Sequence, residues 1–200
     1  MTRAALVLQI SAILVLTAVP TRTVHAQNWE QFRGPRAGVA PDDPRLPDTW
    51  TTTENVAWRI DIPGRSWSSP IVWDDHAFVV TAVNTKNPSQ PLSPVVTYLA
   101  RSLGGTMSGA AISTSTDEHR WTLYDIDVRT GRIRWERQIH AALPQQSVHQ
   151  KNSYASETPV TDGERVYVYL GYVGLFAFDM TGTPVWSTTT CTRASTRGRG

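Results

Sequence analysis

The chain has 200 residues but only one cysteine, Cys191, and five histidines. A single cysteine cannot form an internal disulfide, so a small scaffold held together by cystines is excluded. The histidines beyond the N-terminal segment are scattered, without His-x-x-x-His spacing: His76, His119, His140 and His149. Because metal sites gather such residues at short, regular spacings, we interpret these as surface or turn histidines and predict no metal site.

Long hydrophobic runs are also scarce, and the main one lies at the N-terminus. Residues 4–19 are mostly apolar, Arg3 precedes them, and Val24-His25-Ala26 offers small residues of the kind that a signal peptidase reads. This pattern predicts a signal peptide over residues 1–26, helical within 4–19, and therefore a periplasmic or extracellular protein. A buried N-terminal helix is the alternative. The run is short for a membrane helix, so no stable membrane span is expected after cleavage.

Charge of one sign is lacking once the ends of the chain are set aside. Of the 19 basic residues, two lie in residues 1–26 and three in residues 187–200. Residues 27–186 therefore hold 14 basic and 17 acidic residues, a net charge of −3. We predict that the chain does not bind nucleic acid, because no basic surface is indicated.

The chain contains one sequence pattern that occurs twice. In each copy an apolar pair follows a proline (Pro70, Pro159), then come a polar turn and a run of alternating β-branched and aromatic residues. Such a pattern predicts two antiparallel strands joined by a hairpin. A second β-rich run then reaches a Thr-Gly turn, and a last strand closes on Trp135 or Trp186. Four strands per copy are predicted, near 68–73, 77–82, 121–126 and 132–138, and near 157–161, 165–170, 174–179 and 183–187.

The closing tryptophans lie 51 residues apart, at positions 135 and 186. A period of about 50 residues is typical of β-propeller blades. Trp58 precedes the first copy and is interpreted as the last strand of another blade. We therefore predict an all-β fold, a β-propeller of four-stranded antiparallel blades.

The turns and closing tryptophans resemble the Ala-x-Asp-x-x-x-Gly-x-x-x-Trp motif of pyrroloquinoline-quinone-type β-propeller repeats. The matching positions are Asp127, Gly131 and Trp135 in the first copy and Ala177, Asp179, Gly182 and Trp186 in the second. Asp125 replaces the alanine of the motif, and the second copy is one residue short. Residues 28–35 and 151–156 also resemble segments of secreted bacterial members. The repeat is shared by quinoprotein dehydrogenases, an outer-membrane assembly lipoprotein and other secreted proteins, so the resemblance implies the fold more than the function.

The predicted organisation is that of an incomplete propeller. After the signal peptide come an N-terminal segment with one closing strand (27–65), a blade (66–139) interrupted by a long polar insertion (83–120), a second blade (140–188) and a tail (189–200) that has lost strand alternation. The insertion is expected to be a disordered loop, and the tail a disordered or aberrant end. Propellers close with about four to eight blades, so two blades are expected to leave an apolar face exposed.

Candidate chemistry is sparse, and each candidate has a structural interpretation. Asp127 and Asp179 could form paired carboxylates, but their equivalent places beside Thr-Gly favour turn residues. Trp135 and Trp186 could stack on a quinone, yet an aromatic residue that recurs once per blade favours packing between blades. Asp74-Asp75 fits a hairpin turn. The polar segment Lys151–Tyr154 is the one cluster that the repeat does not explain, and a loop on the propeller face is preferred to a binding site.

Three functions remain open. The preferred prediction is an exported, non-catalytic propeller that binds an unknown protein or small-molecule ligand. The second is a fragment of a quinoprotein dehydrogenase, although no calcium-binding carboxylate set, catalytic Asp or adjacent cysteine pair can be matched. The third is an outer-membrane assembly scaffold, although no cysteine for lipid attachment follows the apolar run. No catalytic residue is predicted, and neither pyrroloquinoline quinone nor a metal is expected to bind.

Overall fold

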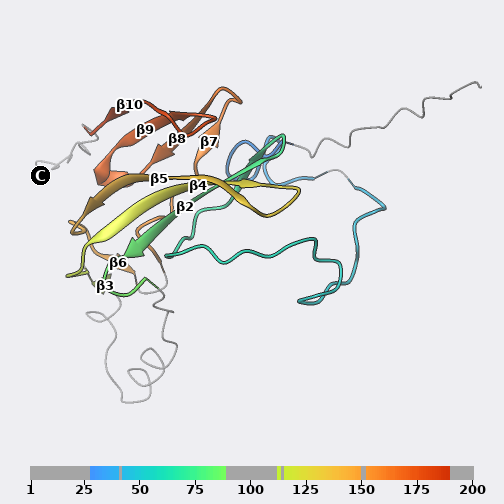
Figure 1. Ribbon diagram of the computed structural model, residues 1–200, viewed down its shortest axis with the longest axis horizontal. Coiled ribbons are helices and arrows are strands. Elements are labelled where there is room, and N and C mark those ends of the chain that lie inside the picture. The colour runs from blue at the N-terminus through green and yellow to red at the C-terminus, as the bar shows by residue number, and fades with distance from the viewer. Residues whose placement is uncertain (1–27, 41, 89–111, 114, 150–151, 190–200) are drawn as a thin grey trace, which may run out of the picture.

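The computed structural model describes residues 28–40, 42–88, 112–113, 115–149 and 152–189. Over these ranges the protein is nearly all-β, and a single 3₁₀ turn, η1 (Gly171–Val173), is the one helical element described (Figure 1). The predicted fold class is therefore confirmed. The signal peptide, its helix and nearly all of the predicted tail lie outside the described residues. Within the described ranges, no helix has the length and apolar character needed to cross a membrane.

The first copy of the repeat forms one four-stranded antiparallel sheet, the first sheet. Its strands are β1 (Ile71–Trp73), β2 (His76–Asn84), β4 (His119–Asp127) and β5 (Ile133–Ala142), in the order β1-β2-β4-β5. Asp74 and Asp75 join β1 to β2, and Asp74 adopts a positive φ of 51°. The predicted hairpin is therefore confirmed, because Asp tolerates the left-handed conformation that such a turn needs.

The second copy forms a matching second sheet. Its strands are β7 (Val160–Thr161), β8 (Arg165–Tyr169), β9 (Leu175–Asp179) and β10 (Pro184–Thr188), in the order β7-β8-β9-β10. All eight strands expected from the repeat are present. β1 and β7 are shorter than predicted because the residues around Pro70 and Pro159 do not pair, and proline has no N–H to give to a ladder.

The two sheets pack face to face, and the main hydrophobic core lies between them. Pairing of Phe78 with Asp125 and of Val80 with Leu123 places these side chains on one face of the first sheet. That core contains Phe78, Val80 and Leu123 from the first sheet with Val166, Val168 and Phe178 from the second, all at most 4% exposed. Alternation along each strand thus assigns one face of each sheet to the same core.

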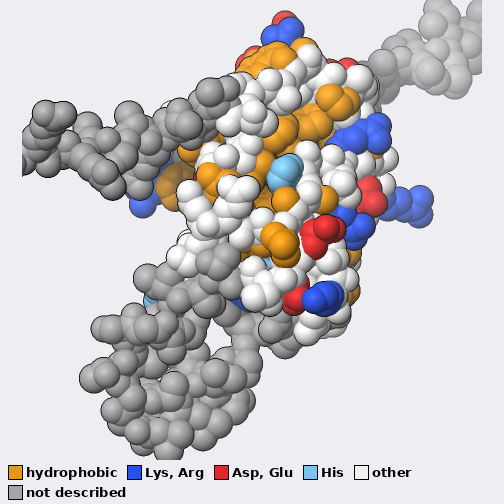
Figure 2. Space-filling model, turned by 90° about the vertical axis from the view of Figure 1, so that its left-hand side faces the viewer, with side chains coloured by type: hydrophobic (Ala, Val, Ile, Leu, Met, Phe, Trp, Pro, Cys, Tyr) orange, Lys and Arg blue, Asp and Glu red, His pale blue; other side chains and the backbone are white. Residues whose placement is uncertain are grey.

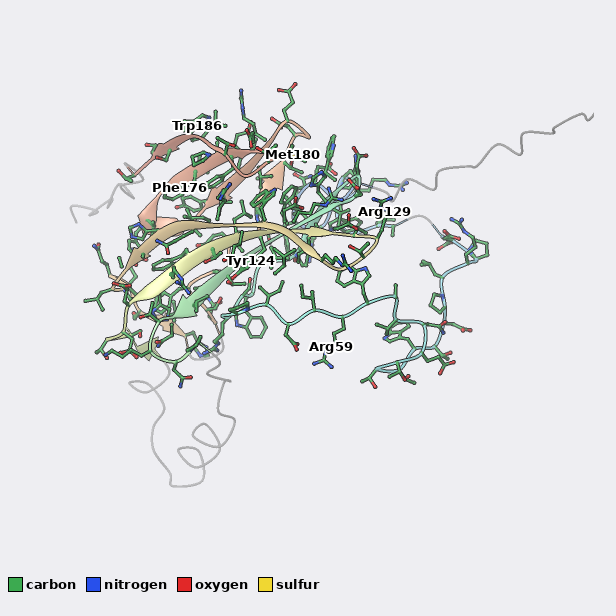
Figure 3. All side chains as sticks on the ribbon, in the orientation of Figure 1. Arg59, Tyr124, Arg129, Phe176, Met180 and Trp186 are labelled. Carbon is green, nitrogen blue, oxygen red and sulfur yellow. The ribbon has the colours of Figure 1, made fainter. Side chains whose placement is uncertain are left out.

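A coil on the N-terminal side covers the other face of the first sheet. Ala77, Tyr124 and Ile126 form a second buried cluster there, against which Trp58 and Ile62 pack. Figure 1 shows the resulting order of layers, with this coil below the first sheet and the second sheet above it; Figure 3 places Arg59 on the coil and Tyr124 near the sheet face. The coil of residues 55–62 is called the N-terminal coil below.

The strand predicted around Trp58 is wrong: no residue from 55 to 62 belongs to a strand. Trp58 reaches the first sheet through its side chain, while isolated bridges at Trp29–Val72 and Arg65–Ala82 are the nearby backbone pairings. A strand needs a neighbouring backbone along its whole length, and the described residues offer none here.

The insertion is shorter and more ordered at its ends than predicted. β2 and β4 remain paired out to Asn84 and His119, and Thr85 N donates to Glu118 O beyond them. Within the expected loop, β3 (Ile112–Ser113) pairs with β6 (Val148–His149). Polar composition concealed this small sheet, because two-residue strands carry no alternation. Residues 89–111 and 114 lie outside the described residues. β5 also passes the predicted blade boundary at 139 and ends at Ala142.

Candidate functional site

The two Thr-Gly turns are built by the aspartates that the repeat places there. The Asp127 Oδ1 accepts hydrogen bonds from the backbone N–H groups of Arg129 (3.0 Å) and Thr130 (2.9 Å). The Asp179 Oδ1 accepts equivalent bonds from Thr181 (2.9 Å) and Thr183 (2.8 Å). These carboxylates therefore satisfy turn backbone, as their position in the sequence suggested.

Each turn receives a tryptophan from the preceding layer. Trp58 Nε1 donates to Val128 O (2.6 Å), and a Cβ added to Gly131 would lie 2.5 Å from its ring. Trp135 Nε1 donates to Met180 O (3.1 Å), and a Cβ on Gly182 would lie 2.8 Å from its ring. Each tryptophan ring therefore packs on a glycine turn of the next layer, and this contact joins the two layers. Packing between blades was expected for Trp135, but the role of glycine as its seat was not.

A further contact of this kind involves Trp73 at the end of β1. Its ring lies over Gly163 in the β7–β8 turn, where the glycine has a φ of 88°. Nothing in the local pattern identified Trp73, because it is not in the repeat motif. The signal that could have found it is Gly163 itself, which follows Asp162 in the second copy where the first copy has a second aspartate.

Trp186 has no such seat among the described residues. Its side chain is 42% exposed, and Figure 3 shows it on the side of the second sheet that faces away from the first. The strand register aligns Val160, Tyr167, Ala177 and Trp186 across that face. Tyr169 and Leu175 pair two residues further along β8 and β9 and lie on the same face; together these six residues form what we call the open face. In Figure 2, hydrophobic side chains reach the surface in the upper part of the molecule, where the second sheet lies.

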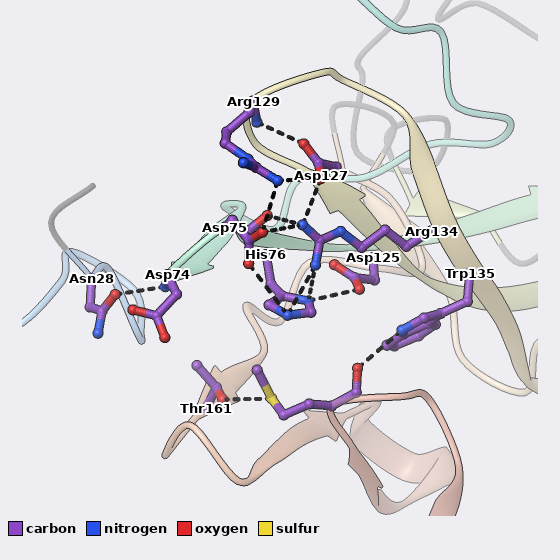
Figure 4. Close-up of polar contacts among 11 residues, drawn as sticks. Asn28, Asp74, Asp75, His76, Asp125, Asp127, Arg129, Arg134, Trp135 and Thr161 are labelled. Atoms are coloured by element: carbon purple, nitrogen blue, oxygen red, sulfur yellow. Dashed lines mark hydrogen bonds and ion pairs between the residues drawn. The ribbon is translucent and has the colours of Figure 1, made fainter. Parts of the chain in front are cut away.

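A buried carboxylate lies at the position where the repeat expects alanine. Asp125 is 0% exposed, and its Oδ2 lies 2.8 Å from His76 Nδ1 (Figure 4). Its other oxygen, Oδ1, has no hydrogen-bond partner among the residues that the structure describes. Burial raises the pKa of the Asp125 carboxyl above its ordinary value, and the hydrogen bond with His76 acts in the opposite direction. The sequence marked Asp125 as a departure, but not as half of a buried pair.

Arg134 connects this pair to two turns. Its Nη2 donates to Asp75 Oδ2 and Asp127 Oδ2, each at 2.6 Å, and its Nη1 lies 3.1 Å from His76 Nε2 (Figure 4). Because arginine can only donate, His76 Nε2 is the acceptor of that hydrogen bond. His76 Nδ1 therefore carries the hydrogen and donates a hydrogen bond to Asp125 Oδ2.

The hydrogen bonds from Arg134 also shift the pKa values of two nearby carboxyl groups. They lower the pKa of Asp127 to about 2 and hold that of Asp75 below its usual value. A carboxyl group with a lowered pKa stabilises the fold above its ordinary pKa. The stabilisation by Asp127 is therefore complete above its ordinary pKa of 3.8 and is lost as the pH falls through about 2.

The remaining polar candidates have structural partners. Tyr154 O accepts from Trp121 Nε1 (2.7 Å), and Tyr154 Oη accepts from Ser115 N (2.8 Å). Ser153 Oγ donates to Ala155 O (3.0 Å), which also accepts from the backbone N–H of residues 67 and 68. Asn152 to Tyr154 therefore brace the loop before β7, and Lys151 lies outside the described residues.

The histidines do not gather into a ligand set. The prediction of a surface or turn residue is wrong for His119, which begins β4 and is 7% exposed; it packs edge-on against Tyr154, and burial lowers the pKa of its imidazole. His140 lies against Trp121, and His149 is in β6. Within the described part of the chain, no group of three or more His, Cys, Asp or Glu residues could hold a metal ion.

Comparison with known proteins agrees with this geometry. The family model described as outer membrane protein assembly factor BamB matches residues 32–197, which include both sheets and both Trp-Gly turns. A search of the curated proteins gives no significant match. The repeated sheets, their aspartate turns and the match over most of the chain lead to one conclusion: this chain belongs to the pyrroloquinoline-quinone-type repeat family to which the assembly factor BamB gives its description.

Proposed function

We propose that the chain is an exported, non-catalytic propeller module that acts by binding a partner. The observation that carries this proposal is that the aspartates and the tryptophan of the repeat form turns and packing contacts. Asp127 and Asp179 hold backbone turns, and Trp135 is seated on Gly182, so that neither carboxylate nor ring is free for a bound cofactor. The description of the matching family as an assembly factor agrees with a binding role.

The open face supplies a surface for such a partner. Val160 is 40% exposed and Tyr169 45% exposed, and both lie on the same face of the second sheet as Trp186. Exposed aromatic side chains grouped on one surface are typical of protein interfaces. A protein is therefore the kind of partner that this surface favours.

The proposal predicts that the protein binds no pyrroloquinoline quinone. A quinone enzyme would need a stacked ring, a cation held by carboxylate and amide oxygens, and a carboxylate placed to accept the substrate proton. We expect no saturable heat of binding when the full chain is titrated with the quinone in the presence of Ca²⁺. Dye-linked oxidation of alcohols and glucose should not exceed the rate without protein.

An active quinoprotein dehydrogenase, reconstituted in the same buffer, is the positive control for that titration. Omitting Ca²⁺ separates a cation-dependent site from quinone adsorbed on exposed tryptophans. Stoichiometric binding with cation-dependent turnover would instead identify the chain as part of a dehydrogenase and overturn the proposal.

The proposal also includes export, which rests on the apolar run of residues 4–19 and the small residues before Gln27. Expression of the full chain in a Gram-negative host should yield periplasmic protein whose N-terminal residue is Gln27. Mass spectrometry of the fractionated cells measures this directly, and Ala26→Tyr should block cleavage while leaving the mature sequence unchanged. Uncleaved wild-type protein in the cytoplasm would contradict export.

A further inference from the structure

We infer that the open face of the second sheet docks onto the first sheet of a second copy of this chain, so that copies associate head to tail. The inference deepens the binding role proposed above and rests on it, because it names the partner of the open face. Within the chain the first sheet packs on the second sheet, whereas the open face of the second sheet packs on none of the described residues.

The contact between the two sheets of one chain joins two unlike surfaces. We call them the giving side, which supplies the tryptophan, and the receiving side, which supplies the glycine turn. The first sheet gives Trp135, with Phe78, Val80 and Leu123 beside it on the same core. The second sheet receives with the Gly182 turn and with Val166, Val168 and Phe178. Arg137 Nε, donating to Gly182 O at 2.7 Å, adds a polar bond at the rim.

The open face repeats the giving side. By the pairing of strands, Trp186 corresponds to Trp135, Tyr167 to Phe78, and Ala177 to Asp125, because each set occupies the same rung of its sheet. The polar group buried in the first sheet is thus an alanine on the open face. Tyr167 already satisfies its hydroxyl, which donates to Asp162 Oδ2 at 2.8 Å. Of the two tyrosine hydroxyls on the open face, that of Tyr167 is therefore already paired, whereas that of Tyr169 has no partner among the described residues and would need one in the second copy.

The chain also contains a second receiving side. The first sheet presents the Gly131 turn and the apolar residues Ala77, Tyr124 and Ile126, as the second sheet presents the Gly182 turn and its own apolar face. Its present cover is the N-terminal coil, which supplies a tryptophan but no strand. The coil already buries these three residues, which are 2–7% exposed, so a sheet of another copy has to displace the coil to reach them.

Exchange of Trp58 for Trp186 of another copy preserves a Trp-Gly contact at Gly131, and the side chains that it newly buries are those of the open face. The hydrogen bond from indole to Val128 O would be lost in one copy and replaced between copies. Such a contact is heterologous, because it joins two different surfaces, and it forms a closed ring if the rotation between copies allows it. Association of this kind buries Val160, Tyr169 and Trp186, which are 40–45% exposed among the described residues.

The test measures the mass of the full, purified chain by light scattering on a sizing column at several protein concentrations. We expect the apparent mass to rise with protein concentration and to level off at an integral multiple of the monomer mass. Trp186→Ala should weaken association at least about tenfold, the loss of roughly 1.4 kcal/mol. Trp50→Ala is the matched control, since Trp50 is a tryptophan that is 69% exposed and belongs to neither sheet.

Trp58 distinguishes head-to-tail association from two open faces meeting each other. Because Trp58 competes for the Gly131 turn, Trp58→Phe should strengthen association by removing the bond to Val128 O. Two open faces packed together would be indifferent to it. Circular dichroism of each variant verifies that the sheets persist, and phenylalanine is chosen at position 58 because it keeps an apolar ring over the first sheet.

A monomer at every concentration would overturn the inference, as would an assembly or aggregate that Trp186→Ala leaves unchanged, or one that Trp58→Phe leaves unchanged or weakens. None of these outcomes bears on quinone binding, so they separate failure of this inference from failure of the non-catalytic role. Conversely, cation-dependent turnover would overturn the role whatever the mass.

Discussion

Gly131→Ala is expected to lower the free energy of unfolding by about 3 kcal/mol, the combined cost of a strained backbone and an overpacked contact. Gly131 has a φ of 70°, where an added side chain is strained. Its new Cβ would also lie 2.5 Å from the ring of Trp58, which must move and give up its hydrogen bond to Val128 O. Urea unfolding followed by circular dichroism measures the change.

Gly38→Ala is the matched control for this prediction. Gly38 has a φ of 93°, but the nearest side-chain atom to its added Cβ is 3.8 Å away. It therefore carries the backbone strain without the crowding, and its cost should be about 1–2 kcal/mol. In a Trp58→Ala background the crowding at Gly131 is gone, so Gly131→Ala should then cost no more than Gly38→Ala. Equal costs in the wild-type background would show that the tryptophan is not seated on the glycine.

His76→Ala is expected to destabilise the protein by about 3–5 kcal/mol, the usual cost of leaving a buried charge without its partner. Asp125 is fully buried and His76 is the residue with which it makes a hydrogen bond, while its Oδ1 has none. Removing the imidazole leaves this carboxylate to be desolvated alone or protonated. Unfolding in urea near neutral pH, where the carboxylate would be charged in the unfolded chain, shows the full effect.

Asp125→Ala should behave in the opposite way, because it places in the first sheet the alanine that the second sheet has at Ala177. Replacing a buried carboxylate together with its hydrogen-bond partner by apolar groups is often neutral or stabilising. The double variant His76→Ala/Asp125→Ala should therefore be more stable than His76→Ala alone. If Asp125→Ala proves as costly as His76→Ala, the pair contributes net stability and this account of it is wrong.

The sequence predicted the strands because their signals are local. Alternation around Phe78 and Val166, and the aspartate turns before Gly131 and Gly182, are each contained within a few residues. The coil at Trp58 was misjudged for a related reason: its tryptophan resembles the closing residue of a repeat, but a strand also requires a neighbouring backbone that no local pattern reveals. The pairing of β3 with β6 depends on such neighbours too.

The candidate site was harder to predict because its contacts join residues far apart in the chain. Asp125 stood out as the wrong residue for its position, yet its partner His76 lies 49 residues earlier. Arg134 occupies a place taken by Val185 in the second copy, and nothing in one copy alone shows that it joins two turns. Comparison of the two copies could have identified both positions, since equivalent residues that differ in charge mark where the repeat has been adapted.

The seating of each tryptophan on the glycine turn of the next layer also bears on how such a chain can lengthen during evolution. The contact spans the boundary between neighbouring copies, from Trp135 to Gly182, and each copy carries both halves. Duplicating one whole copy in the gene therefore restores the same contact at each new junction, and deleting one rejoins the halves that remain. The heritable unit is therefore one whole copy, from one closing tryptophan to the next, and a gene can gain or lose it without altering the remaining junctions.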